Sequence, residues 1–177
     1  TLRGTPFIYY GDEIGMREGD LPRGEIMDPP GRRYWPLYKG RDGCRTPMQW
    51  DAAPNAGFSA VKPWLRVNPD YAQRNVQAQR DDPDSLLNYY RRLIELRRQS
   101  PALVHGNYRA LGRPVQVWAY ERATQKQRMI VALNFFSRPA QITVEGDWCI
   151  RLSSVERADR NVFGTLALAP NEAVIME

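Results

Sequence analysis

The pattern of apolar and polar positions changes near Pro101, and we predict a domain boundary there. After Pro101, short apolar runs alternate with Gly, Pro, Asn and Asp, which is typical of strands joined by turns. Such regularly spaced short strands predict an antiparallel β-sandwich. The runs cover residues 108–111, 115–121, 129–136, 141–144, 148–152, 165–168 and 173–176.

The part before Pro101 ends in the clearest helical pattern of the chain. Asp84 or Ser85 suits the N-cap position, and Ser100 followed by Pro101 ends the pattern. We interpret the acidic residues 81–84 as the helix start, because they lack the spacing of a calcium loop. One apolar face recurs at helical spacing and consists of Leu86, Leu87, Tyr90, Leu93 and Ile94.

The N-terminal part predicts one unit of a parallel barrel. Residues 7–10 are apolar and are bounded by turn residues, which favours a fully buried strand. Residues 17–83 carry many Pro, Gly, Asp and aromatic residues with little periodicity, and a loop of this length indicates a functional excursion. In barrels of alternating strands and helices, the active site lies at the strand ends from which such loops leave.

Composition excludes several function classes. The 177 residues are 42% hydrophobic, enough for a core, and the net charge of +5 comes from dispersed arginines without an aromatic-interleaved basic patch. We therefore expect no nucleic-acid partner. No apolar run approaches the ~20 residues that span a bilayer, so we expect a soluble part with no membrane partner.

The cysteine and histidine content indicates neither a metal nor a cofactor. Cys44 and Cys149 lie far apart, so we expect reduced thiols and a cytoplasmic location. His105 is the only histidine, which leaves no histidine triad and no multi-histidine metal site in this chain. The glycines of residues 11–15 are too few, and their neighbours too acidic, for a phosphate-binding loop.

The segment Lys-Gly-Arg-Asp-Gly-Cys-Arg-Thr-Pro-Met-Gln-Trp-Asp at residues 39–51 resembles a signature of α-glucosidases of the α-amylase family. Residues 5–16, 55–59 and 62–71 are similar to the same family, so the resemblance covers nearly the whole chain. It implies that residues 1–100 form the last strand, loop and helix of a (β/α)8 TIM barrel with a long active-site loop. Residues 101–177 would then be the C-terminal antiparallel β-sandwich domain.

The resemblance implies that the parent enzyme is an oligo-1,6-glucosidase-like α-glucosidase, which hydrolyses terminal bonds of oligosaccharides or disaccharides with retention. The family's catalytic carboxylates lie on earlier strands, so no catalytic residue is assigned here. Because the chain opens with Thr1 rather than Met, we expect a fragment. We expect it to be inactive alone because it lacks those carboxylates, and to need the remainder of its own barrel. Without that remainder its apolar faces would be uncovered, so we expect poor solubility. Two alternatives stay open: a glucosyltransferase or isomerase of the same family, and a non-catalytic barrel relative acting as an interaction scaffold.

Arg41 is the candidate substrate-binding residue. Its guanidinium offers five fixed donors, and the resemblance implies that it clamps the terminal glucose. The alternative is that Arg41 or Arg45 only forms an ion pair with Asp42 or Asp51. We assign Arg45 to supporting the loop.

Asp12 and Glu13 are interpreted as supporting residues as well. Retaining glycosidases need two carboxyl groups facing each other about 5–5.5 Å apart, whereas adjacent residues at a strand end point apart. Trp50, Phe58 and Trp64 suit sugar stacking, but aromatic residues in so long a loop more often form its internal core. For Asp20, Glu25 and Asp28 we expect solvent exposure.

Overall fold

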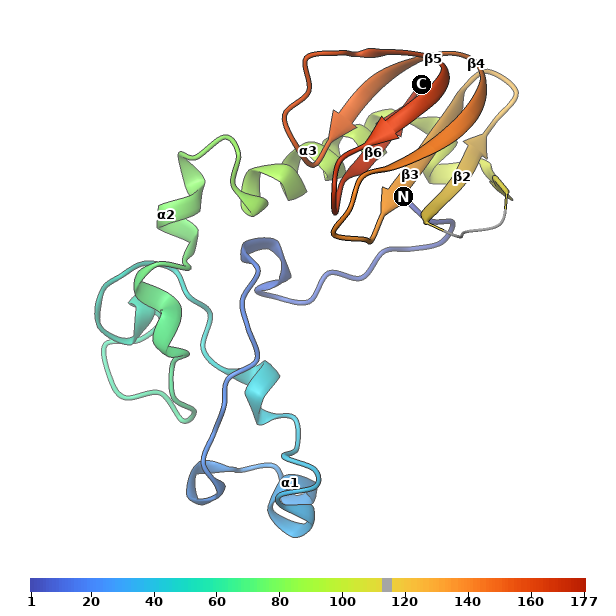
Figure 1. Ribbon diagram of the computed structural model, residues 1–177. Helices are drawn as coiled ribbons and strands as arrows, with labels where there is room; N and C mark the ends of the chain where they lie inside the picture. Colours follow the sequence, from blue (N-terminus) through green and yellow to red (C-terminus); the bar gives the residue numbers. More distant parts are fainter. Residues whose placement is uncertain (113–115) are drawn as a thin grey trace. The chain divides into compact units, whose positions relative to one another are not determined.

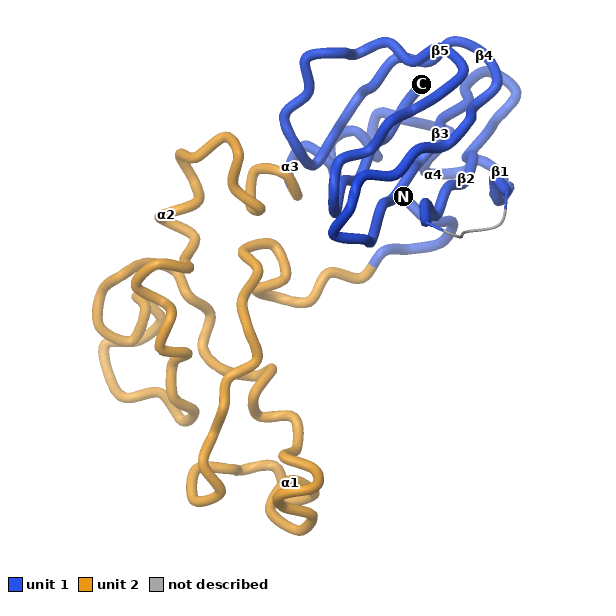
Figure 2. The backbone as a smooth tube through the Cα atoms, in the orientation of Figure 1, with its two compact units in different colours: residues 1–6, 91–177 blue, residues 7–90 orange. Residues whose placement is uncertain are grey.

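The computed structural model describes residues 1–112 and 116–177 and is shown in Figure 1. The chain divides into two compact units, coloured in Figure 2. We call residues 7–90 the loop unit, and residues 1–6 together with 91–177 the sheet unit. The domain boundary near Pro101 stays a prediction, and Val115, part of one predicted strand, lies outside the described residues.

The sheet unit is built on one antiparallel sheet whose six described strands follow the order β1-β2-β3-β6-β4-β5. The prediction of short antiparallel strands is confirmed. The strands are β1 (Asn107–Ala110), β2 (Val117–Ala123), β3 (Arg128–Asn134), β4 (Ala140–Ser153), β5 (Asn161–Leu168) and β6 (Ala173–Met176).

Strand β4 joins two of the predicted runs, and the β-sandwich arrangement itself stays a prediction. The runs 141–144 and 148–152 belong to this one strand, which is interrupted by a bulge between Thr143 and Asp147. Its first part pairs with β5, and its last residues pair with β6. Because a bulge bends a strand and increases its twist, β4 carries the sheet from one partner to the other without a break.

Side chains alternate between two apolar clusters on opposite faces of the sheet. Along β3, Ile130 and Ala132 join one cluster, whereas Met129 and Val131 join the other. This alternation follows from the two-residue period of a strand. The first cluster is closed by residues of β4 and β5, including Trp148 and Leu166. Both faces of the central strands are therefore buried.

Helices α3 (Leu86–Gln99) and α4 (Pro101–His105) confirm the predicted helix and its end near Ser100. The Asn88 backbone N–H donates to Ser85 Oγ at 3.3 Å, so Ser85 acts as the predicted cap. The C-terminal part of α3 places Leu93 and Leu96 against the second apolar cluster, together with Leu103 of α4. None of the helices in the described ranges is long and apolar enough to cross a bilayer.

The buried strand expected at residues 7–10 is wrong. These residues form no strand, and all four side chains are exposed, Phe7 to 94%. A strand exists through hydrogen bonds to neighbouring strands, and no described segment pairs with residues 7–10. An apolar run by itself indicates burial without supplying the partner that would bury it.

The rest of the loop unit consists of short elements rather than one structureless loop. Helices α1 (Pro29–Tyr34) and α2 (Val76–Arg80) are its α-helices. Two small apolar clusters, one around Ile14 and one around Ile26, form its interior. Single 3-10 turns cover Asp12–Ile14, Arg23–Glu25, Asp42–Arg45, Pro54–Gly57 and Pro69–Ala72.

Candidate functional site

Arg41 precedes the 3-10 turn Asp42–Arg45 and is held by the carboxylate of Asp28. Its Nη2 donates to Asp28 Oδ1 at 3.0 Å, and its backbone N–H donates to Asp28 Oδ2 at 3.2 Å. The Arg41 side chain is 57% exposed and the Asp28 side chain only 2%. The site thus presents an outward-facing guanidinium on a buried anchor.

The ion pair changes the acidity of both partners. The hydrogen bond from the Arg41 side chain lowers the pKa of the Asp28 carboxyl below its ordinary value. The same hydrogen bond raises the pKa of Arg41. Asp28 is therefore ionised, and Arg41 stays charged, throughout the neutral range.

The exposure expected for Asp28 is wrong, and the alternative in which Arg41 only pairs with Asp42 or Asp51 is wrong as well. Asp28 is buried rather than exposed, and Arg41 pairs with Asp28 rather than with Asp42 or Asp51. Both alternative acids accept backbone N–H groups. Asp42 Oδ2 accepts from Met27 at 2.6 Å and from Asp28 at 2.8 Å, and Asp51 Oδ1 accepts from Ala53 at 2.8 Å.

Two glycines allow the chain to approach itself at this point. Gly40 has a φ of 82°, and a Cβ there would lie 2.7 Å from Asp28 Oδ2. At Gly31 in α1, a Cβ would lie 2.6 Å from the carbonyl oxygen of Lys39. Any larger side chain would push residues 28–31 away from residues 39–41, so these glycines are needed for the Asp28–Arg41 contact.

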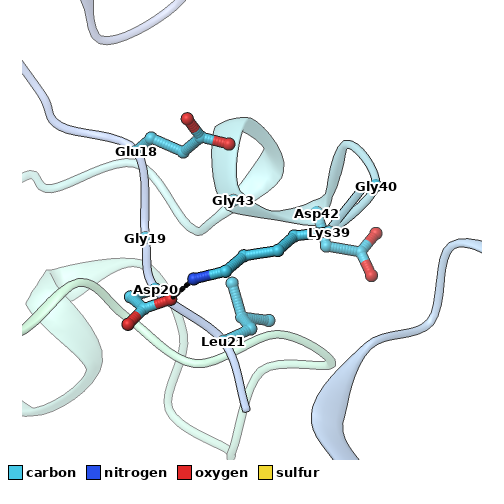
Figure 3. Close-up of a pocket in the computed structure, with 8 residues that line it drawn as sticks. All are labelled: Glu18, Gly19, Asp20, Leu21, Lys39, Gly40, Asp42 and Gly43. Carbon is cyan, nitrogen blue, oxygen red and sulfur yellow. Dashed lines mark hydrogen bonds and ion pairs between the residues drawn. The ribbon is translucent and has the colours of Figure 1, made fainter. Parts of the chain in front are cut away.

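A small cavity of about 180 Å³ is lined in part by Gly40 and Asp42, the residues on either side of Arg41 in the sequence. Figure 3 shows the Lys39 side chain extending across it to Asp20, with 2.7 Å between Lys39 Nζ and Asp20 Oδ1. Both partners of this pair are exposed, and Asp20 is exposed as predicted. The lining residues are Glu18, Gly19, Asp20, Leu21, Lys39, Gly40, Asp42 and Gly43.

A second cavity of about 410 Å³ is lined by four aromatic residues of the loop unit. Trp50, Phe58 and Trp64 are all exposed, so the interpretation that they form the internal core of the loop is wrong. The interior is instead made of the aliphatic clusters around Ile14 and Ile26. The cavity is lined by Tyr10, Glu13, Arg45, Thr46, Pro47, Met48, Trp50, Phe58 and Trp64.

Asp12 and Glu13 hold the turn before this cavity. Asp12 Oδ2 accepts the backbone N–H of Tyr9 at 3.0 Å, and Glu13 Oε2 accepts that of Gly11 at 2.9 Å. The structure brings Glu13 and Arg45 to the aromatic cavity, while Arg41 is anchored at Asp28. The supporting roles of Asp12, Glu13 and Arg45 stay predictions.

The sequence did not indicate that Asp28 pairs with Arg41. Asp28 stands 13 residues before Arg41, and no periodic pattern connects the two positions. Gly31 and Gly40 permit the close approach of the two segments. The loop contains many other glycines, so the sequence does not distinguish these two. Within residues 1–112 and 116–177, no three His, Cys, Asp or Glu side chains gather as a metal site requires.

Comparison with known proteins identifies the family. Residues 1–106 match the model of the α-amylase catalytic domain, and the chain belongs to the α-amylase family. It is 45% identical to a probable α-glucosidase of Rhizobium meliloti over 60% of the chain and 19% of that protein. It is 35% identical to a glucan 1,6-α-glucosidase of Streptococcus pneumoniae over 99% of the chain and 36% of that protein. The chain thus spans only about a third or less of these relatives.

The solved structures with the same fold include a trehalulose synthase and an isomaltulose synthase. The match to the trehalulose synthase of Pseudomonas mesoacidophila covers 98% of this chain and 35% of the synthase chain, with a TM-score of 0.88 and 33% identity. The match to the isomaltulose synthase of Klebsiella sp. covers 99% of this chain and 36% of the synthase chain, with a TM-score of 0.86 and 32% identity. Glucosidases and synthases are therefore both among the similar proteins.

Proposed function

We propose that these residues are the C-terminal part of a retaining α-glucosidase, which hydrolyses terminal α-glucosidic bonds of oligosaccharides or disaccharides. The observation that carries the proposal is the exposed Arg41 guanidinium, anchored on buried Asp28 inside the segment that matches the α-amylase catalytic domain. A guanidinium held in this way keeps donors free for sugar hydroxyls. Arg41 is assigned to the terminal sugar.

The rest of the chain supports this site. We propose that residues 1–100 belong to the end of a (β/α)8 barrel and that residues 101–177 form the antiparallel domain following it. The exposed apolar side chains of residues 7–10 suit a segment that packs against other parts of a barrel. The exposed free thiols Cys44 and Cys149 suit a reducing compartment, and we assign the protein to the cytoplasm.

The test is glucose release from maltose, isomaltose, sucrose and trehalose by the full-length protein that contains these residues. Arg41→Ala should lower kcat/KM on the order of 10–100-fold, because one or two hydrogen bonds from a charged donor are lost. Arg66→Ala is the matched control, since Arg66 pairs with exposed Glu25 in the same unit. We expect no turnover by purified residues 1–177, and measurable turnover by them would contradict the placement of the catalytic carboxylates elsewhere.

The second candidate is an isomerase or glucosyltransferase, favoured by the likeness to trehalulose synthase and isomaltulose synthase. Product analysis with sucrose separates the two candidates. A hydrolase releases equal amounts of glucose and fructose, whereas an isomerase returns a disaccharide of the same mass. An inactive full-length protein would refute both candidates and favour the interaction scaffold.

A further inference from the structure

We propose that Asp28 is a positioning residue for sugar recognition, which orients the Arg41 guanidinium and thereby sets the affinity for the terminal sugar. This inference rests on the proposed function, because it needs Arg41 to contact the substrate. It concerns a residue that lies outside the motif of residues 39–51.

The first argument is that Asp28 restrains Arg41 at two points. One carboxylate oxygen accepts the side chain, and the other accepts the backbone N–H of the same residue. A single contact would leave the long arginine side chain free to rotate about its torsions. Two contacts from one rigid group fix the start and the end of that side chain together, which reduces the entropy lost when a ligand binds.

The second argument is that the segment carrying the carboxylate is itself held in place. The backbone N–H of Asp28 donates to Asp42 Oδ2, and the backbone N–H of Arg41 donates to Asp28 Oδ2. Each of the two segments therefore supplies a carboxylate that binds the backbone of the other. The backbone of Gly40 also packs closely against the Asp28 carboxylate. There is no space between them for a Cβ on residue 40, which would lie 2.7 Å from Asp28 Oδ2. Asp28 is thus a buried, fixed anchor rather than one member of a mobile surface pair.

The third argument is that the pair leaves Arg41 accessible. Two other ion pairs of the loop unit, Lys39–Asp20 and Arg66–Glu25, have both partners exposed, which is the arrangement of ordinary surface pairs. In the Arg41 pair the acid is buried and the arginine is more than half exposed. A buried acid that fixes an exposed base is suited to presenting that base to a ligand.

Asp28→Asn in the full-length protein is the direct test. Both carboxylate oxygens accept hydrogen bonds from Arg41, so an amide in either orientation places its NH2 group against a donor. With p-nitrophenyl α-glucoside as the probe, KM should rise about 10-fold, as expected for losing one charge-assisted contact, with a smaller change in kcat. Asp20→Asn, which breaks an exposed pair in the same unit, should leave KM unchanged.

A double-mutant cycle separates positioning from a general structural role. In an Arg41→Ala background, Asp28→Asn should change KM no further, because the group through which it acts is already gone. An equal rise of KM in both backgrounds would overturn the inference. So would a wild-type KM for Asp28→Asn.

Asp28→Glu keeps the test decisive if Asp28→Asn does not fold. It retains the charge, but its extra methylene displaces the carboxylate from the position fixed beside Gly40, so KM should rise here too. A folded Asp28→Glu with a wild-type KM, or loss of folding in both variants, would show a purely structural role. No turnover by the wild type would instead refute the proposed function, and with it this inference.

Discussion

The two units are stabilised in different ways. In the sheet unit, a continuous ladder of strands places alternate side chains in two apolar clusters. In the loop unit, short turns are fixed by carboxylates that accept nearby backbone N–H groups, such as Asp12 with Tyr9, Asp42 with Met27 and Asp51 with Ala53.

Apolar burial stabilises the sheet unit, whereas polar contacts in the loop unit set the position of Arg41. Apolar burial scales with area and does not depend on the direction of a contact, so it makes a sheet stable without placing any one polar group. A carboxylate bound to specific N–H groups fixes a local conformation, because a buried polar group left without its partner is costly. The loop unit can therefore hold Arg41 outward in a defined position with a small apolar interior.

The largest effect is expected from breaking the sheet core. Leu166 in β5 is 1% exposed, and Leu166→Ala should lower the free energy of unfolding by about 2–5 kcal/mol through lost burial and a new cavity. Phe163 lies in the same strand but is 69% exposed, so Phe163→Ala should change it by less than about 0.5 kcal/mol. Urea denaturation of the full-length protein measures both. Similar losses in the two variants would refute this account of the core.

The next prediction tests whether the position of Asp28 depends on the close approach of the Gly40 backbone. Gly40→Ala should cost about 1–2 kcal/mol for a left-handed conformation and should also displace the Asp28 carboxylate. Gly24→Ala is the matched control, since no atom lies within 4 Å of a Cβ at that position. We expect Gly40→Ala to raise KM for the glucoside. An unchanged KM in a folded Gly40→Ala protein would contradict the role of Gly40 in fixing Asp28.

A smaller effect concerns the pH dependence of the sheet unit. Burial raises the pKa of Glu121, but hydrogen bonds from Arg128 and Arg109 more than offset it, so the pKa lies below its ordinary value. A depressed pKa means that the carboxylate stabilises the folded state above the unfolded value of about 4.3, and that this stabilisation is lost as the pH falls through the lower folded value.

Glu121→Gln should therefore weaken the loss of stability as the pH falls below about 4.3, measured as the urea midpoint. Exposed Glu156 supplies the control, and Glu156→Gln should retain the wild-type pH dependence. If the Glu121→Gln and wild-type curves run parallel through this range, the assignment to Glu121 is incorrect.

The smallest effect is expected at the surface of the loop unit. Asp20→Asn removes the Lys39–Asp20 pair, whose partners are both exposed, so thermal unfolding of the variant should match that of the wild type. A clear fall in the melting temperature would mean that exposed pairs contribute to the loop unit. In that case polar stabilisation would not be confined to carboxylates that accept backbone N–H groups.

The sequence alone determined the elements that rest on periodicity and local chemistry. Residues 86–99 predict their helix because apolar residues recur on one face and Ser85 and Pro101 mark its ends. The strands of the sheet unit follow from short apolar runs separated by turn residues. The motif of residues 39–51 was sufficient to indicate the α-amylase family, to which the chain belongs.

The tertiary structure decided which residues meet. The contact of Asp28 with Arg41, the burial of Asp42 and the continuity of β4 across its bulge all depend on segments brought together by folding. The exposed residues 7–10 show the same point from the other side, because an apolar run is buried only where other segments cover it. Local sequence encodes the preference of a segment, whereas a contact requires a second segment whose position no local pattern specifies.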